Sequence, residues 1–207
     1  MFKDRIEAGK QLAKRLKKYK SKTPIVLAIP RGGVVVGKEL AKVLNCPLDV
    51  IVTKKIGAPG NPELAIGAVG PDGTVVLNQE LAPRTGADKK YISEEKKVKS
   101  EEVKRRMRAF RKGKKPLNLT GKTVVLTDDG IATGATVEAA IRWIKTQKPK
   151  KLILAVPVSA PDSLAKLIPL ADEVVCLDQP YFFAAVGQFY QKFPQTTDEE
   201  VIEILKQ

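Results

Sequence analysis

Five short segments rich in apolar residues constrain the fold most, because each has the length and composition of a strand buried on both faces of a sheet. They lie at residues 25–29, 48–52, 123–127, 151–156 and 173–177. Helical patterns lie between several of them, as in residues 32–44, about 134–146 and around Leu164. Strands that alternate with helices predict an α/β fold, a doubly wound and mostly parallel sheet.

A long segment between the second and third of these strands does not follow the alternation. Residues 54–63 are so rich in Gly and Pro that we expect an irregular, mobile loop. Residues 66–69 and 74–77 flank Asp72-Gly73 and predict a β-hairpin. Residues 88–111 predict a long charged helix, supported by pairs at a spacing of four, which are Glu95 with Lys99, Glu101 with Arg105 and Glu102 with Arg106.

The length of 207 residues favours one domain. We expect the core to span about residues 21–178, and a small hood to be formed by residues 1–20 and 179–207. In the first of these segments, an apolar stripe that includes Phe2, Ile6 and Leu12 predicts a helix with one buried face.

Composition excludes several kinds of chemistry. The chain has no His and only two Cys, which excludes His-based triads, Cys/His zinc sites and a disulfide framework. It has no apolar run of about 20 residues and no signal-peptide pattern, so we expect a cytoplasmic protein that does not enter a membrane. The net charge of +14 points to anionic partners, and residues 89–115 carry most of it, with thirteen Lys and Arg against four Glu.

The clearest functional motif is Thr127-Asp-Asp-Gly-Ile-Ala-Thr-Gly-Ala-Thr136, which follows a predicted buried strand and precedes a predicted helix. Loops at the carboxyl ends of parallel strands are where such sheets bind ligands. Backbone N–H groups at a helix N-terminus favour a phosphate, and the hydroxyls of Thr133 and Thr136 add donors. The carboxylates of Asp128 and Asp129 suit sugar hydroxyls. We therefore predict a sugar-phosphate site, with the phosphate held by Ile131, Ala132, Thr133, Gly134, Ala135 and Thr136.

Residues 124–136 resemble the phosphoribosyl pyrophosphate signature of type I phosphoribosyltransferases. Independently, Pro30-Arg31-Gly32-Gly33 resembles the diphosphate-binding loop of the same enzymes, in which a non-proline cis peptide turns amides toward the ligand. By this resemblance the cis bond lies between Pro30 and Arg31. Nearly the whole chain also resembles a little-characterised branch of that superfamily, as in Gln195-Thr-Thr-Asp-Glu-Glu200.

The resemblance implies a phosphoribosyltransferase of nucleotide salvage that works with Mg²⁺ as its cofactor. Phosphoribosyl pyrophosphate and a nitrogenous base are the implied substrates and diphosphate is released. Asp128 and Asp129 would bind the ribose, and would hold the metal directly or through the donor and water. The segment from Lys54 to Leu64 takes the place of the flexible catalytic loop, in which Lys54 or Lys55 would bind the departing diphosphate.

The base that accepts the phosphoribosyl group is less defined by the sequence. Ala132 stands where the 6-oxopurine enzymes have Asp and the adenine enzymes have Ala, which favours a purine-like base outside the 6-oxopurines. By position, Glu63 would assist a purine nitrogen. In the predicted hood, Phe183 and Val186 would sandwich the base, although this aromatic cluster equally suits packing at the sheet edge or a subunit contact.

A second class of function stays open. A protein of this fold can sense the ligand and bind RNA or DNA through a basic face, and residues 89–115 supply such a face. Its few aromatics and its balancing Glu residues favour an ordinary solvated helix instead. The resemblance also implies a homodimer.

Overall fold

The computed structural model describes residues 1–206, except for the side chain of Glu63. Its strands are β1 (Ile25–Ala28), β2 (Leu48–Val50), β3 (Lys54–Ala58), β4 (Asn61–Val69), β5 (Val75–Leu77), β6 (Thr123–Thr127), β7 (Lys151–Val158) and β8 (Glu173–Asp178). Its α-helices are α1 (Arg5–Leu16), α2 (Gly32–Leu44), α3 (Leu81–Arg84), α4 (Lys89–Arg111), α5 (Ala135–Thr146), α6 (Pro161–Leu167) and α7 (Asp198–Lys206). Short 3₁₀ segments span Lys17–Lys22, Ile168–Leu170 and Val186–Phe189.

The main sheet is the parallel five-stranded sheet that the sequence predicts. Its strand order is β2-β1-β6-β7-β8, and every neighbouring pair is parallel. The chain passes from β1 to β2 in one direction and later returns to place β6 on the other side of β1. The order therefore reverses between β1 and β6, which is the point where open α/β sheets bind ligands.

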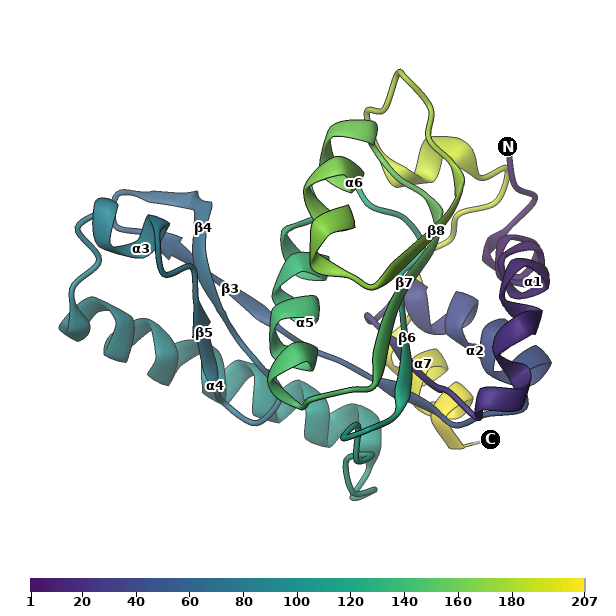
Figure 1. The fold of residues 1–207 in the computed structure, drawn as a ribbon, viewed down its shortest axis with the longest axis horizontal. Coiled ribbons are helices and arrows are strands. Elements are labelled where there is room, and N and C mark those ends of the chain that lie inside the picture. The colour runs from purple at the N-terminus through teal and green to yellow at the C-terminus, as the bar shows by residue number, and fades with distance from the viewer. Residues whose placement is uncertain (207) are drawn as a thin grey trace.

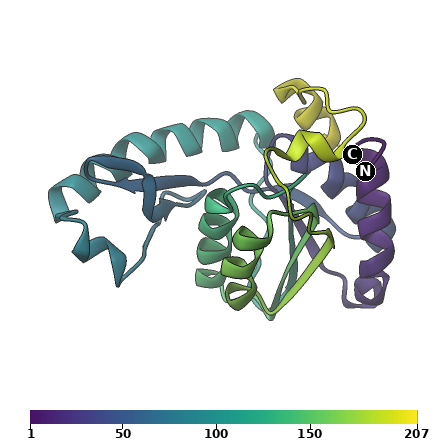
Figure 2. The same cartoon turned by 90° about the horizontal axis from the view of Figure 1, so that it is seen from above.

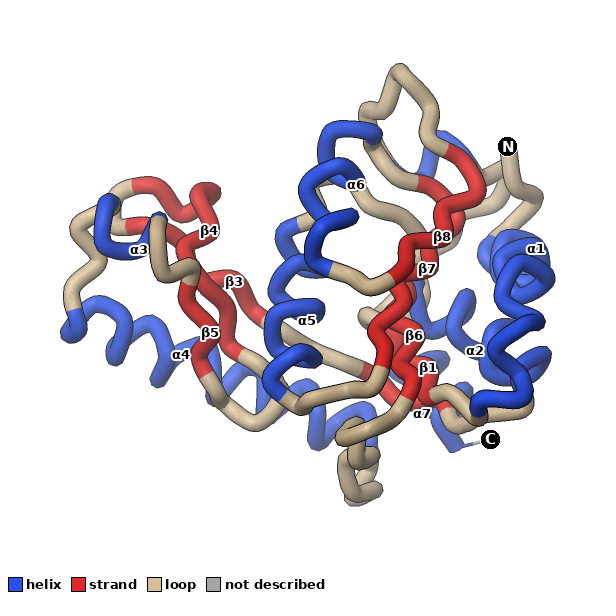
Figure 3. Tube along the Cα trace, in the orientation of Figure 1, coloured by secondary structure: helices blue, strands red, loops and turns tan. Residues whose placement is uncertain are grey.

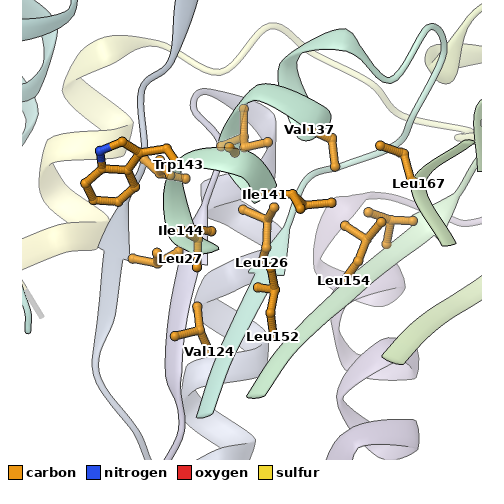
Figure 4. Close-up of a cluster of buried hydrophobic side chains, with 14 of the residues drawn as sticks. Leu27, Val124, Leu126, Val137, Ile141, Trp143, Ile144, Leu152, Leu154 and Leu167 are labelled. Carbon is orange, nitrogen blue, oxygen red and sulfur yellow. The ribbon is translucent and has the colours of Figure 1, made fainter. Parts of the chain in front are cut away.

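The sheet lies between two helical layers (Figure 1). Apolar side chains on both faces of its central strands pack against these layers. In β6, Val124 and Leu126 pack with α5, whereas Val125 between them packs with α1 and α2. Figure 4 shows the α5 side of this core, where Ile141 and Ile144 lie over the strands. Alternation of this kind, apolar on both sides, explains why these strands read as unbroken apolar runs.

The first helix differs from its expected place in the hood. Leu12, Ala13 and Leu16 of α1 are fully buried against α2 and the sheet, so this helix belongs to the core layer. The residues that precede α1 and its first turns lie against the hood: Phe2 forms a parallel bridge with Tyr190, and Ala8 packs in the same apolar cluster. Ile6 is not on the buried stripe, because 45% of its surface is exposed.

The segment expected to be a mobile loop is regular. Residues 54–58 and 61–69 form the antiparallel strands β3 and β4, which pair with β5 in a second, three-stranded sheet (Figure 3). The prediction from Gly and Pro content was wrong because these residues fit the pairing: a Cβ on Gly57 would lie 2.6 Å from the Cα of Pro62. The hairpin between β4 and β5 is confirmed.

The long basic helix is also confirmed, and with this small sheet it forms an arm that projects from the core (Figure 2). Asp88 caps it by accepting from the backbone N–H of Tyr91. Of the three expected pairs, only that of Glu95 with Lys99 is an ion pair in the described structure. Its last turn is fixed to the core because the Arg111 guanidinium donates twice to the Asp49 carboxylate, at 2.9 and 2.7 Å.

Candidate active site

Two connections meet at the point where the strand order reverses. One joins β1 to α2 through Pro30 and Arg31, whose peptide bond is cis, as the resemblance implies. The other joins β6 to α5 through residues 128–134. Because β1 and β6 are parallel neighbours, both connections leave the same edge of the sheet (Figure 3).

The two connections approach so closely that glycine is required in the first of them. A Cβ on Gly32 would lie 1.9 Å from Oδ2 of Asp129, and one on Gly33 would lie 2.8 Å from both Cα and Oδ1 of Asp128. Neither distance is compatible with a side chain unless the acids move. The Gly-Gly pair therefore sets how near the two loops come to each other.

The carboxylates of Asp128 and Asp129 are neighbours with different surroundings. Oδ1 of Asp128 accepts the backbone N–H of Asp129 at 2.8 Å. Burial raises the pKa of the Asp128 carboxyl well above its ordinary value, and the adjacent negative charge of Asp129 raises it further. Asp129 has a counter-ion, because Nε of Arg5 donates to its Oδ2 at 2.7 Å.

Residues of the hood contact this acidic loop and fix its position. The hydroxyl of Tyr190 donates to the carbonyl of Asp129 at 2.5 Å. Arg5 donates from a terminal nitrogen to the carbonyl of Pro194 at 2.7 Å, and its guanidinium lies 3.7 Å from the centroid of the Phe193 ring. Arg5 is only 8% exposed, so it joins the hood to the acidic loop from within the structure.

The second half of the motif forms the start of α5. Gly134, with φ of +77°, is the N-cap residue, and no side chain caps the first backbone N–H groups of the helix. Thr133 and Thr136 lie beside those groups. The N–H of Ile131 is not available to a ligand because it donates to the carbonyl of Val158 at 2.9 Å. The amide donors of this loop therefore begin at Ala132, one residue later than predicted.

Two cavities border the connections, and Pro30 lines both. The first, which we call the aspartate cavity, has a volume of about 480 Å³ and is lined by Asp128, Asp129, Arg5 and Arg31 and by the hood residues Phe193, Gln195 and Thr196. The second, the lysine cavity, has a volume of about 350 Å³. Its polar lining comes from several segments and consists of Thr53, Lys54, Lys55, Arg106, Thr133 and Thr136.

Comparison with known proteins places this architecture in a family. The phosphoribosyl transferase domain family matches residues 3–192. The chain belongs to that phosphoribosyl transferase family.

Several proteins of known sequence or structure are similar to most of the chain. A Mycobacterium tuberculosis relative, "Putative phosphoribosyl transferase Rv0571c", is 46% identical over 205 residues. That match covers 99% of this chain and 46% of the relative, so the chain spans about half the length of the curated relatives it matches. The crystal structure of TT1426 from Thermus thermophilus is 42% identical, with a TM-score of 0.93 over 99% of this chain and 97% of that chain. A Neisseria gonorrhoeae protein crystallised with ppGpp shares the fold alone, at 17% identity and a TM-score of 0.51, over 85% of this chain and 78% of that chain.

The structure brings together only some of the residues that the phosphoribosyltransferase resemblance selects. Lys54 and Lys55 lie with Thr133 and Thr136 in the lysine cavity. Arg31 lies in the other cavity, where its guanidinium is 3.6 Å from the Asp198 carboxylate of α7.

Both predicted base-binding residues lie outside the two cavities, and one of them, Val186, packs on the acidic loop. Val186 packs over Gly130, where a Cβ would lie 2.5 Å from Cγ1 of Val186. Phe183 packs against Phe189, with 4.8 Å between ring centroids. The side chain of Glu63 lies outside the described residues.

The lining residues that were not selected from the sequence for these cavities include Arg5, Phe193, Thr53 and Arg106. Arg5 and Arg106 lie in helices rich in other cations, and no local pattern separates them from those cations. Gln195 and Thr196 had a signal, because they begin the Gln195–Glu200 segment that carries part of the resemblance. In the part of the chain that the structure describes, no helix has both the length and the apolar content needed to cross a membrane.

Proposed function

We propose that this chain transfers the 5-phosphoribosyl group of phosphoribosyl pyrophosphate to a nitrogenous base and releases diphosphate. The observation that carries the proposal is the contact between the Asp128–Asp129 loop and the Gly32–Gly33 turn at the reversal point of the sheet. This contact sets a pair of carboxylates between a loop of amide donors and a cavity lined by cations. A molecule with a phosphate, a ribose and a diphosphate needs those three kinds of environment.

The 5′-phosphate is assigned to the start of α5. The uncapped N–H groups there, from Ala132 to Thr136, carry the partial positive charge of a helix N-terminus. The hydroxyls of Thr133 and Thr136 belong to the same loop. Ser163 holds the loop in shape, because its hydroxyl donates to the carbonyl of Ala132 at 2.5 Å.

The ribose is assigned to Asp128 and Asp129, whose carboxylates accept hydrogen bonds from its hydroxyls. In the reaction the bond from the anomeric carbon to diphosphate breaks, its electron pair leaves with the diphosphate, and positive charge develops on the ring. Two fixed carboxylates beside the ring stabilise that charge through electrostatics. Arg5 keeps Asp129 in place on the hood side.

The departing diphosphate is assigned to the junction of the two cavities. The Pro30–Gly33 turn borders it on one side, and Lys54 and Lys55 on the other. Holding the donor and the base in line supplies on the order of 7–11 kcal/mol of such a barrier, so positioning by these loops is a large part of the catalysis.

The donor set fits Mg²⁺. Asp128 and Asp129 provide hard carboxylate oxygens that line one cavity. Because the Asp128 carboxylate is buried next to the negative charge of Asp129, a bound cation would stabilise its charged form. No cluster of three or more acidic or Cys side chains suited to a metal occurs among the described residues. Two carboxylates with substrate and water oxygens are a common Mg²⁺ environment. When bound, the ion would neutralise charge on the diphosphate and orient the donor.

For the accepting base we propose a purine-like ring in the aspartate cavity, beside Phe193 and under the hood. Ala132 supports a ring outside the 6-oxopurines. Val186 borders the acidic loop at Gly130 and Phe183 packs against Phe189, both outside this cavity, so contact of either with the base would require the ring to extend beyond the cavity toward Gly130. We also propose the homodimer and the cytoplasmic setting that the resemblance implies.

The decisive experiment supplies Mg²⁺, phosphoribosyl pyrophosphate and a panel of purine and pyrimidine bases, and records nucleotide by mass and diphosphate by a coupled assay. We expect base-dependent diphosphate release. The double variant Asp128→Asn with Asp129→Asn should lose donor binding by calorimetry, while circular dichroism shows an intact fold. The proposal is wrong if the parent neither binds the donor nor releases diphosphate with any base, or if the double variant binds the donor as tightly as the parent.

A further inference from the structure

The basic helix α4 reaches the lysine cavity at one point. All of its residues lie in the described part of the chain, and among them Arg106 is the one that lines this cavity. The residue before it, Arg105, is exposed on the helix surface. This strongly basic helix therefore contributes one particular cation to the candidate site.

Arg106 is positioned by rigid surroundings. Its guanidinium lies 5.5 Å from the centroid of the Phe110 ring, one helical turn later, and Phe110 is only 1% exposed. A cation over an aromatic face at this distance is attracted to it. The helix itself is fixed one residue beyond Phe110 by the two hydrogen bonds from Arg111 to Asp49.

The same stretch of α4 holds the neighbouring lysine. Glu102, one turn before Arg106, pairs with Nζ of Lys54 at 2.6 Å. This contact lowers the pKa of the Glu102 carboxyl. The Glu102 carboxylate thus holds Lys54 at the cavity wall. An anion bound in the cavity would compete with this carboxylate for the Lys54 ammonium group.

We propose that Arg106 binds the diphosphate end of the donor together with Lys54, and that Glu102 is the counter-ion that Lys54 exchanges for the anion. This proposal rests on the proposed function for the identity of the ligand. A guanidinium binds phosphate oxygens through two parallel N–H groups, which a lysine does not do. Arg106 therefore gives orientation as well as charge, and the long helix of the arm becomes part of the substrate site.

The test uses inorganic diphosphate as the probe, titrated calorimetrically into the whole chain in buffer with Mg²⁺. Arg106→Gln should weaken diphosphate binding about tenfold or more, the size expected for a charge-assisted hydrogen-bonded pair. Arg105→Gln is the matched control, since it removes the same charge from the next residue of the same helix and should change binding less than about twofold. Arg106→Lys should restore only part of the affinity.

A second probe, ribose 5-phosphate, separates the two ends of the donor. The start of α5, to which its phosphate is assigned, lines the same cavity as Arg106, so Arg106→Gln should weaken its binding several times less than it weakens diphosphate binding. Equal weakening for the two probes would overturn the assignment of Arg106 to the diphosphate end. Glu102→Gln should tighten diphosphate binding severalfold in the parent and have no such effect in a Lys54→Met background.

The outcomes distinguish this proposal from the proposed function. Equal weakening by the Arg105 and Arg106 variants would mean that only overall charge matters, and no weakening by Arg106→Gln would remove the residue from the site. Either result overturns the inference while leaving base-dependent turnover untouched. Failure of turnover with every base would reject the proposed function, and the effect of Arg106 on diphosphate binding would still be measurable.

Discussion

Arg5 donates from Nε to Oδ2 of Asp129 across 2.7 Å, which links the first helix of the chain to the acidic loop after β6. The side chains are 9% and 15% exposed, so water screens the pair little. A buried pair is costly to break on one side only, because the remaining charge stays desolvated.

The first prediction follows from that contact. Arg5→Ala should lower the free energy of unfolding by about 3 kcal/mol, because Asp129 then lies beside Asp128 with no counter-ion. It should also weaken donor binding. Arg15→Ala, on the exposed face of the same helix, is the control and should stay within about 0.5 kcal/mol of the parent. Urea unfolding measures the free energy of unfolding of the two variants. Equal stability of Arg5→Ala and Arg15→Ala would contradict the prediction.

The second prediction concerns Asp128, whose pKa burial raises. A raised pKa in the folded state means that the folded chain holds its proton more tightly than the unfolded chain, so stability falls as pH rises from the unfolded value of about 4 through the raised folded value. Asp128→Asn removes this penalty. Without Mg²⁺, the variant should therefore be more stable than the parent at pH 7.

Denaturant unfolding of the parent and Asp128→Asn at pH 4 and pH 7, in buffer that contains a metal chelator, tests this prediction. The difference between variant and parent should shrink toward pH 4, where Asp128 is protonated in the folded chain and about half protonated in the unfolded chain. A constant difference over that range would show that the charge of Asp128 is not its source.

The sequence predicts the main sheet well because both of its faces are buried. In a strand such as β6, nearly every position faces a buried layer and is apolar. A continuous apolar run of this kind can be recognised in the sequence alone. The acidic loop is equally visible, since its acids, Gly134 and its threonines lie within one short segment. The predicted role of this loop depends on the spacing of residues that are close together in the chain, and that spacing can be read directly from the sequence.

The arm and the second half of the site were harder to predict for physical reasons. In β3 and β4 the Gly and Pro residues hide the alternation that normally marks a strand, and bulges at Gly57 break the register. Arg5 and Arg106 are held near the cavities by contacts with Phe193 and Phe110. The first of these contacts joins residues that are distant in the chain, so it depends on the tertiary fold and not on a local motif.

The third prediction concerns Trp143, the single tryptophan of the chain. Its Nε1 donates to Oδ1 of Asp72 at 3.0 Å, which fixes α5 to the turn of the β4–β5 hairpin. Trp143→Phe should lower the free energy of unfolding by about 1–2 kcal/mol, because the hydrogen bond and part of the ring are lost. Asp72→Asn keeps an oxygen acceptor and should cost less. Thermal unfolding followed by circular dichroism compares them, and a larger loss for Asp72→Asn would contradict the assignment.

The fourth prediction tests the contact between the two loops through Gly32. A Cβ there would lie 1.9 Å from Oδ2 of Asp129 and 2.7 Å from Nε of Arg5, so Gly32→Ala must displace the acid, the guanidinium or the turn. Because the acid is assigned to the ribose, donor affinity measured by calorimetry should fall at least about tenfold, which corresponds to about 1.4 kcal/mol. Gly67→Ala is a matched control, since its Cβ would lie 2.7 Å from Leu77 in the small sheet of the arm. It should lower thermal stability while donor affinity stays within about twofold of the parent. If both variants lose stability but neither loses affinity, the close approach of the loops serves packing, and the ribose must be held elsewhere.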